Sequence, residues 1–348
     1  MKPENPIISL QKVLLSYGKG KAKNLLAQNL NLTATESQLI ALVGTNGIGK
    51  STLLRTIAGL QKLQTGSIEL FGQSIKSLNA KALARYVSVV LTGQEEISYV
   101  KASELVAMGR LPHTGWLGNF SPTDYEKVQA ATEQARVTHL LEKPIYQLSD
   151  GERQKVMIAK ALAQDTPIMI LDEPTTHLDI ANRVSIVQLL RTLVRDHNKC
   201  IIFSTHDIEL ALQVANRIWL MHDQTVSDNV PEDLVLSGTL SNAMGSELAG
   251  FHPESGTFRI KQPAKRFISL EGSGTTAQWT QRALERVGYQ VQPDHSIVIE
   301  IFSDSEWIIY QEGQIICIAH SIEHLLDELA RIDSPFFLPS SEYVGNKK

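Results

Sequence analysis

The sequence predicts an α/β domain followed by a small α+β domain. Two short, fully apolar runs at residues 168–171 and 201–203 are typical of buried parallel strands. They alternate with segments of helical spacing, such as residues 151–163. Strands that alternate with helices favour a mostly parallel sheet that helices cover on both faces. Near residue 252 this pattern stops, and the remaining chain has the pattern of a separate, smaller unit.

The elements of the first domain are expected in the following order. Loosely alternating apolar residues predict a strand at 7–16, and a glycine-rich turn leads from a strand into a helix at 51–60. The other strands are expected at 30–32, 39–43, 168–171 and 201–203, and the other helices at 102–108, 124–135 and 151–163.

The second domain is expected to follow a linker, because His252, Pro253, Gly256 and Pro263 form a stretch that favours turns. We therefore place the domain boundaries at 1–262 and 263–348. The smaller domain is expected to contain strands at 267–270, 297–302, 307–310 and 315–319 and helices at 276–287 and 322–332. The last three strands are separated by turn-like residues, which favours a hairpin meander. No role follows from this pattern.

The composition argues against a nucleic-acid-binding protein, a disulfide-rich or zinc-binding scaffold, and a membrane-spanning chain. The chain has 348 residues and a formal net charge of −4, which gives no basis for nucleic-acid binding. Cys200 and Cys317 are too few for a disulfide framework or a zinc cage, and we expect both to be buried, reduced thiols. No window approaches the roughly 18 apolar residues that span a bilayer, and the N-terminus does not resemble a secretory signal. Any role at a membrane is therefore expected to depend on partner proteins.

Residues 44–51, Gly-Thr-Asn-Gly-Ile-Gly-Lys-Ser, fit the phosphate-binding pattern G-x-x-x-x-G-K-[ST] between a strand and a helix. Glycines let successive backbone N–H groups point at phosphate oxygens, and the helix N-terminus adds positive potential. Lys50 is expected to reach the β- and γ-phosphates, and the Ser51 hydroxyl to ligate Mg²⁺. The loop residues expected to contact the nucleotide are Gly44, Asn46, Gly47, Ile48, Gly49, Lys50, Ser51 and Thr52. A plain glycine turn is the structural alternative.

The strand at 168–171 ends in two carboxylates, Asp172 and Glu173. At a strand tip, Asp172 is expected to hold Mg²⁺ directly or through water, and Glu173 to act as general base on the attacking water. The later strand ends in a run that contains His206, which is expected to hydrogen-bond the γ-phosphate and orient the water. Taken alone, paired acids at a strand end also occur as solvated turn residues.

These motifs together resemble the ATP-binding cassette (ABC) family of P-loop ATPases, from about residue 7 to residue 260. The run Leu148-Ser149-Asp150-Gly151-Glu152 resembles the family's signature, usually written LSGGQ, and lies upstream of the acidic strand. Asp179 lies in a segment that resembles the D-loop, His206 matches the switch histidine, and Tyr17 occupies the place of the aromatic residue that stacks on adenine. The resemblance implies a RecA-like core with a helical subdomain.

The resemblance also implies a mechanism. Two copies of the chain would form a head-to-tail dimer with two ATP molecules in the interface. Each ATP would lie between the phosphate loop of one copy and the signature of the other, where Ser149, Gly151 and Glu152 would approach the γ-phosphate. Hydrolysis would depend on Mg²⁺, with Ser51 and Asp172 as ligands. The Q-loop glutamine of the family would be a further metal ligand. In this sequence Gln94 is the candidate for that position, but an offset of one or two residues would place Thr92 there instead.

The signature departs from the family pattern at two positions. Asp150 replaces the first glycine, and Glu152 replaces glutamine. Asp150 adds a side chain and a negative charge near the expected phosphate, whereas the serine and second glycine are retained. We expect activity to persist.

The segment from Glu104 to Trp116 resembles the ATPases of importers for iron-siderophores, haem and vitamin B12, as do residues 121–124 and 252–254. A plain helix cap around Trp116 is the structural alternative. The resemblance implies integral-membrane permease subunits as partners, an indirect link to a substrate-binding protein, and a cytoplasmic place on the inner face of the cell membrane. An exporter ATPase and a non-transport ABC ATPase remain alternatives, and the cargo does not follow from these residues.

One further pattern lies in the second domain. Residues 272–277 follow an expected strand and open a helix, and Asp294 follows about 20 residues later, which resembles a dinucleotide-binding fingerprint. The short segment and the expected meander argue against that interpretation. A regulatory role or a role in dimerisation is the preferred hypothesis.

Overall fold

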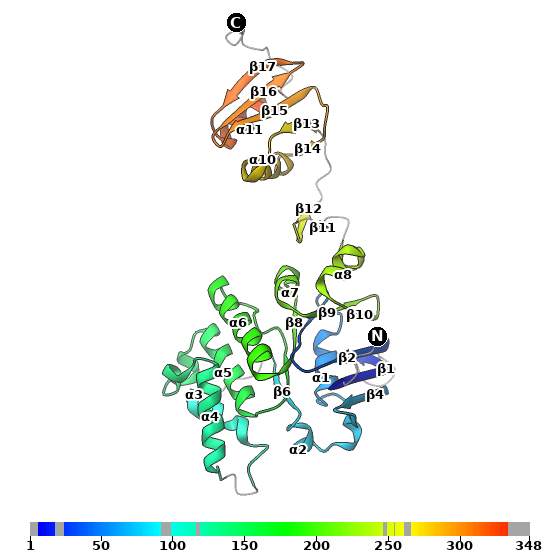
Figure 1. The fold of residues 1–348 in the computed structure, drawn as a ribbon, viewed down its shortest axis with the longest axis vertical. Helices are drawn as coiled ribbons and strands as arrows, with labels where there is room; N and C mark the ends of the chain where they lie inside the picture. Colours follow the sequence, from blue (N-terminus) through cyan, green and yellow to red (C-terminus); the bar gives the residue numbers. More distant parts are fainter. Residues whose placement is uncertain are drawn as a thin grey trace. The chain divides into compact units, whose positions relative to one another are not determined.

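The structure is a computed structural model that describes residues 6–17, 24–91, 99–115, 119–245, 249–253, 255–260 and 266–332. The chain divides into two compact units, one from the N-terminus to Gly245 with Phe251–Phe258, and one that contains the C-terminal region (Figure 1). Within the described ranges no helix combines the length and the apolar character that crossing a bilayer requires.

The first unit is built on a six-stranded sheet in the order β10-β9-β3-β8-β7-β6. Five neighbouring strands pair in parallel, and β10 pairs antiparallel at one edge. The strands are β3 (Leu39–Val43), β6 (Val87–Val90), β7 (Ile168–Leu171), β8 (Cys200–Thr205), β9 (Arg217–His222) and β10 (Thr225–Asn229). All residues of β3, β7 and β8 are buried, as predicted for continuous apolar runs covered on both faces.

A second, antiparallel sheet has the order β2-β1-β4-β5. Its strands are β1 (Ile8–Tyr17), β2 (Asn24–Ala34), β4 (Thr65–Leu70) and β5 (Gln73–Ser74). One hydrophobic cluster joins this sheet, α1 (Lys50–Ile57) and the large sheet, and it includes Ile68, Leu54 and Ile202. β2 is much longer than the strand predicted at 30–32. The prediction was too short because exposed polar residues interrupt the apolar alternation along this strand.

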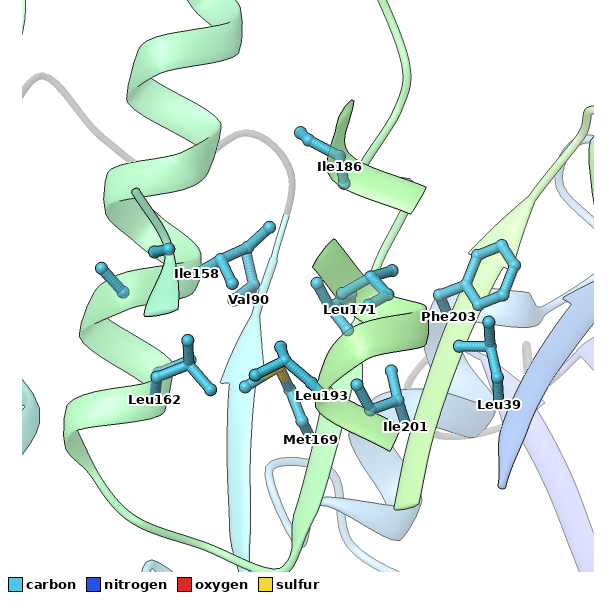
Figure 2. Close-up of a cluster of buried hydrophobic side chains, with 14 of the residues drawn as sticks. Leu39, Val90, Ile158, Leu162, Met169, Leu171, Ile186, Leu193, Ile201 and Phe203 are labelled. Atoms are coloured by element: carbon cyan, nitrogen blue, oxygen red, sulfur yellow. The ribbon is translucent and has the colours of Figure 1, made fainter. Parts of the chain in front are cut away.

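A helical subdomain lies against the other face of the large sheet. Its main helices are α3 (Ala102–Ala107), α4 (Pro122–Gln134) and α5 (Asp150–Ala163), and α6 (Ile180–His197) follows the sheet strand β7. Figure 2 shows α5 and α6 directing side chains such as Ile158 and Leu193 toward Val90, Met169 and Ile201 of the sheet. The helices predicted at 102–108, 124–135 and 151–163 are confirmed to within a few residues.

The remaining elements of the first unit are short. They are the 3₁₀ turns η1 (Ile75–Ser77), η2 (Met108–Arg110), η3 (Thr138–Leu140) and η4 (Ile145–Gln147) and the helices α2 (Ala80–Leu83), α7 (Ile208–Val214), α8 (Pro231–Leu236) and α9 (Thr239–Met244). The strands β11 (Ala249–His252) and β12 (Thr257–Ile260) each have residues in both units. The linker predicted from residue 252 is wrong in its first part, because β11 and β12 pair there. The rings of Phe251 and Phe258 contact each other in a tilted arrangement, with centroids 5.1 Å apart, and both side chains pack on the core of the first unit.

The C-terminal unit contains one five-stranded sheet in the order β14-β13-β15-β16-β17. Its elements are β13 (Arg266–Glu271), α10 (Gly274–Arg286), β14 (Tyr289–Val291), β15 (Ile297–Ser303), β16 (Glu306–Gln311), β17 (Gln314–Ala319) and α11 (Ile322–Ile332). The predicted meander is confirmed for β15, β16 and β17. However, β13 pairs in parallel with both β14 and β15, so β13, α10 and β14 form a βαβ unit that the sequence did not predict.

The glycines at the start of α10 have a packing explanation. Gly272 has φ 144°, and a Cβ there would lie 2.9 Å from Cβ of Ile301 on β15. Gly274 has φ 82°, a conformation that glycine adopts without strain. The glycines that resembled a dinucleotide fingerprint are therefore explained by the close approach of the backbone at Gly272 to β15 and by the backbone conformation at Gly274.

A buried ion pair ties the start of α4 to η2 and to the end of α5 within the helical subdomain. Nε of Arg110 donates to Oδ1 of Asp124 at 2.8 Å, and the two side chains are 6% and 8% exposed. Asp124 also closes a capping box with Ser121 at the start of α4, and Arg110 donates to the carbonyl of Ala163 at the end of α5. Hydrogen bonds from Ser121, joined by Arg110, lower the pKa of Asp124 to about 2. Its contribution to stability is therefore present above its unfolded pKa and lost as the pH falls toward about 2.

We expect Arg110→Ala to lower the free energy of unfolding by about 3–5 kcal/mol, because it leaves a buried carboxylate without its cation. Urea denaturation of the full chain measures this loss. Lys127→Ala is the matched control, since Lys127 pairs with Asp165 at the same 2.8 Å but with side chains 43% and 45% exposed. That exposed pair is expected to contribute less than about 1 kcal/mol. Equal losses in the two variants would contradict the role given to burial.

Candidate functional site

A hollow of about 350 Å³ lies where β3 leads into α1. Its lining residues come from the phosphate loop, the first two strands and the end of β7: Tyr17, Asn24, Leu26, Asn46, Gly47, Gly49, Lys50, Ser51, Thr52 and Glu173. Residues far apart in the sequence, predicted separately as phosphate-binding and catalytic, therefore meet in one hollow. A larger hollow of about 780 Å³, lined by Arg136, Lys155 and Arg191 among others, contains none of the predicted site residues.

The backbone of the loop requires glycine at two positions that line the hollow. Gly47 has φ 77° and Gly49 has φ 119°, and both values lie in the left-handed region. Gly49 is also the N-cap of α1, so the free N–H groups of the first helical turn face the loop. This arrangement provides a cradle of backbone donors suited to an anion such as phosphate. Of the predicted loop residues, Gly44 and Ile48 do not line the hollow, and Ile48 packs against the core.

Lys50 begins α1 and is only 6% exposed. Its Nζ donates hydrogen bonds to the carbonyl oxygens of Gly44 at 2.8 Å and Thr45 at 3.2 Å. Burial lowers the pKa of Lys50, and the nearby charges of Glu173 and Asp172 oppose this shift. The loop thus holds a desolvated cation beside its backbone donors, where an anionic ligand would interact with it strongly.

Asp172 and Glu173 follow β7 and are linked through a serine of the neighbouring strand. Asp172 is 2% exposed, and its Oδ1 accepts a hydrogen bond from Oγ of Ser204 at 2.7 Å. The same Oγ accepts from the backbone N–H of Glu173 at 2.8 Å. Ser204 therefore sets the positions of both acids. No sequence motif predicted this role for Ser204, although a serine that directly follows an apolar strand run was a usable signal.

Glu173 has φ 50°, an uncommon conformation for a residue with a side chain. Its Oε2 accepts a hydrogen bond from Oγ1 of Thr176 at 3.0 Å and lies 3.8 Å from Nδ1 of His206. The structure thus brings the predicted base and the predicted histidine together at the edge of the hollow. Such backbone strain costs about 1–3 kcal/mol and is common at functional sites. Thr176 is a second partner that the sequence analysis missed.

The donors near the hollow suit a hard cation. The Ser51 hydroxyl and the Asp172 carboxylate supply oxygen ligands, which Mg²⁺ prefers over nitrogen or sulfur. The Ser51 side chain lines the hollow, and the charge of Asp172 acts on Lys50 in the same hollow. The two candidates for the Q-loop position, Gln94 and Thr92, lie outside the described residues, as does Trp116.

The signature residues form a separate group that does not line this hollow. Ser149 is exposed and caps α5: its Oγ accepts from the backbone N–H of Glu152, whose carboxylate accepts from the backbone N–H of Ser149 at 2.9 Å. That backbone hydrogen bond lowers the pKa of Glu152. Asp150 pairs with Arg153 one turn later, so its added charge is partly balanced within the helix.

Asp179, predicted to be a D-loop residue, is the N-cap of α6 and accepts hydrogen bonds from both the backbone and the side chain of Asn182. A Cβ on Gly151 would lie 2.5 Å from Cγ of Asn182. Asn182 of α6 therefore lies between Asp179 and Gly151, and glycine is required at position 151 for its close approach. Tyr17, by contrast, lines the hollow with 67% of its surface exposed, as a platform for a flat ring would be.

Comparisons with known proteins agree with this geometry. Residues 27–176 match the family model described as ABC transporter, and residues 264–330 match the model described as iron ABC transporter C-terminal domain. An uncharacterised ABC transporter ATP-binding protein of Methanocaldococcus jannaschii is 34% identical over 81% of this chain and 97% of its own length. The petrobactin import ATP-binding protein FpuD of Bacillus anthracis is 35% identical over 66% of this chain and 82% of its own.

Solved structures give the same result. An inward-facing structure described as a metal-chelate type ABC transporter has a TM-score of 0.61 and 26% identity, covering 73% of this chain and 96% of the other. The dimeric structure of a bacterial ABC transporter cassette has a TM-score of 0.58 and 27% identity, covering 64% of this chain and 98% of the other. The predicted fold class, a RecA-like core with a helical subdomain and a C-terminal domain, is confirmed.

Proposed function

The chain belongs to the ATP-binding proteins of ABC transporters, and from that premise we propose that it is the ATP-hydrolysing subunit of an importer for iron chelates or cobalamin. The observation that carries the proposal is the meeting of Lys50, Ser51 and Glu173 in one hollow, with His206 beside Glu173. The match to the iron ABC transporter C-terminal domain supports an iron-containing cargo.

ATP is proposed to bind with its phosphates along the loop backbone and its adenine on Tyr17. The buried ammonium of Lys50 would then leave the loop carbonyls for the β- and γ-phosphates, where it offsets their charge. Ser51 and Asp172, with Gln94 or Thr92, are the proposed side chains for Mg²⁺, which when bound offsets charge on the phosphate oxygens. The remaining loop contacts are assigned to Gly44, Asn46, Gly47, Ile48, Gly49 and Thr52.

Glu173 is proposed to accept a proton from the water that attacks the γ-phosphorus as the bond to the β–γ bridging oxygen breaks. Ser204 positions the backbone of Glu173 by accepting a hydrogen bond from its N–H, and Thr176 positions the carboxylate by donating to Oε2. His206, 3.8 Å from Oε2, is placed to contact the water or the γ-phosphate. A positioned general base of this kind contributes about 10²–10⁴-fold to a rate.

Two copies of the chain are proposed to share each ATP. The exposed Ser149 and the free N–H groups at the start of α5 form a second anion-binding surface outside the hollow, which a partner copy's phosphates would complete. Glu152 would hold Ser149 in place through the capping box, and Asp179 would hold the neighbouring start of α6 through its hydrogen bond from Asn182. A dimeric cassette among the similar structures supports this arrangement.

The proposed partners are integral-membrane permease subunits and, through them, a substrate-binding protein. The chain would then act as a peripheral protein at the cytoplasmic face of the membrane. We assign residues 1–262 to the ATPase domain and 263–348 to the accessory domain.

Uptake measurements test the cargo. Cells that lack this gene are supplied with radiolabelled ferric hydroxamate, ferric catecholate, haem or cobalamin, and are complemented with the natural chain or with Glu173→Gln. We expect accumulation of an iron chelate or of cobalamin only with the natural chain. Unchanged uptake of every member of the panel in the deletion strain would reject the cargo assignment.

A further inference from the structure

Three side chains that commonly ligate metals meet in the C-terminal unit, outside the proposed ATPase site. They are Cys317 on β17 and His324 and Glu328 on α11. The cysteine Sγ, an imidazole nitrogen and a carboxylate oxygen all lie within 4.8 Å of one another. Among the described residues, no other group of three Cys, His, Asp or Glu side chains lies close enough together to hold a metal ion.

The fold itself creates this cluster. His324 and Glu328 are four residues apart on α11, so they lie on the same face of the helix. Leu325 and Leu329 of α11 are buried in the core of the C-terminal unit together with Cys317, which joins the helix to the strand. Cys317 pairs across the sheet with the buried Ile309, and its side chain therefore lies on the inner face of the sheet, where α11 packs.

The cluster is shielded on one side and open on the other. Cys317 is 8% exposed, the Glu328 side chain 14% and the His324 side chain 44%. Nε2 of His324 lies 3.7 Å from Oε1 of Glu328, and Arg331 pairs with the same carboxylate oxygen. The exposed His324 side chain therefore marks the side from which a small ion would approach the cluster.

We propose that Cys317, His324 and Glu328 bind one divalent transition-metal ion of the Zn²⁺, Fe²⁺ and Co²⁺ class. A thiolate and an imidazole favour these ions over Mg²⁺ and Ca²⁺, which prefer oxygen ligands alone. Three protein ligands leave the fourth tetrahedral position for water or an exogenous ligand. The proposal does not depend on the ATPase mechanism, because none of the three residues belongs to the first unit.

Binding requires only local movement. Ligand bonds of about 2.0–2.3 Å in a tetrahedral site place the donor atoms roughly 3.3–3.7 Å apart, so atoms that lie within 4.8 Å of one another need to move closer by at most roughly 1.5 Å. The solvent-facing side chain of His324 can supply this movement by rotation, and the Glu328 carboxylate, whose Oε1 pairs with Arg331, has a second oxygen for the metal. Burial, with the adjacent carboxylate of Glu328, raises the pKa of the Cys317 thiol. Because the thiol must lose its proton, binding should strengthen as the pH rises.

Cobalt titration of the full chain without nucleotide tests the proposal. We expect one equivalent of Co²⁺ to give tetrahedral d–d absorption and a thiolate-to-cobalt charge-transfer band, and Zn²⁺ to abolish both by displacement. The hollow of the first unit has no cysteine in its lining, so Co²⁺ bound there gives no such band. Cys317→Ser should remove the band, and His324→Gln and Glu328→Gln should each weaken binding at least about tenfold.

Two controls separate this site from its surroundings. His320→Gln alters a histidine that lies near Glu306 and outside the cluster, and it should leave the titration unchanged. Cys200→Ser removes the other cysteine and should leave the band in place. Thermal unfolding of each variant establishes that it is folded, and the substitutions of the half-exposed His324 and the more buried Glu328 on α11 remain informative if Cys317→Ser unfolds. The absence of a charge-transfer band in the natural chain, or its survival in Cys317→Ser, would overturn the proposal.

Discussion

Glu173→Gln is expected to lower the rate of ATP hydrolysis by about 10²–10⁴-fold, because it removes the proposed general base and retains its size. The amide still accepts a hydrogen bond from Thr176, and the backbone N–H of residue 173 still donates to Ser204. ATP binding should therefore persist, and ATP should trap the two copies as a dimer that does not turn over. Phosphate release measures the rate, and size-exclusion chromatography with Mg²⁺ and ATP measures the dimer.

Glu209→Gln provides the matched control for this prediction. Glu209 lies on the exposed side of α7, three residues after His206, and the same substitution there should leave turnover within about twofold. A Glu173→Gln variant that hydrolyses ATP at the natural rate would exclude Glu173 as the base. A variant that stays monomeric with ATP would contradict the shared site instead.

Lys50→Ala is expected to weaken ATP binding by about 10- to 100-fold, because charge-assisted hydrogen bonds to phosphate are worth about 1.5–3 kcal/mol. The fold should tolerate the change, because burial of the charged ammonium is itself unfavourable, as the lowered pKa of Lys50 indicates. Its present partners are two loop carbonyls, which the cavity left by alanine would expose to water. Isothermal titration with ATP measures the affinity, and thermal unfolding without nucleotide measures the stability.

Lys62→Ala is the control for charge alone, because Lys62 is exposed shortly after α1. It should leave both the ATP affinity and the unfolding temperature unchanged. Natural affinity in Lys50→Ala would contradict the placement of the phosphates on this loop. A large loss of stability without nucleotide would mean that Lys50 is needed mainly for the fold.

The parts of the fold that were predictable are those with long or fully apolar patterns. The buried strands β7 and β8 contain continuous apolar runs, which a covered parallel sheet explains, and α5 has apolar residues at helical spacing over 14 residues. β14 was missed because three residues carry too little periodicity, and only pairing with β13 makes them a strand. β11 and β12 were missed because their local turn residues indicated a linker, while the contact between the tilted rings of Phe251 and Phe258 depends on the tertiary structure.

For the candidate site, motif spacing was sufficient to predict which side chains gather around the phosphate loop. Lys50, Ser51 and Glu173 meet because the carboxyl ends of β3 and β7 lie at the same edge of a parallel sheet. The supporting hydrogen bonds of Ser204 and Thr176 have no sequence motif of their own. Cys317 shows the same limit: the sequence predicted a buried thiol, which is confirmed, but its neighbours His324 and Glu328 depend on how α11 packs on β17.

Co-purification from the native membrane tests the central claim most directly. The full chain is tagged, extracted in mild detergent, and its stoichiometric partners are identified by mass spectrometry. We expect a polytopic permease, with a gene for an iron-chelate or cobalamin binding protein beside the gene for the permease. Recovery of ribosomes, DNA-repair factors or no membrane protein would leave the ATPase chemistry in place and contradict the role in transport.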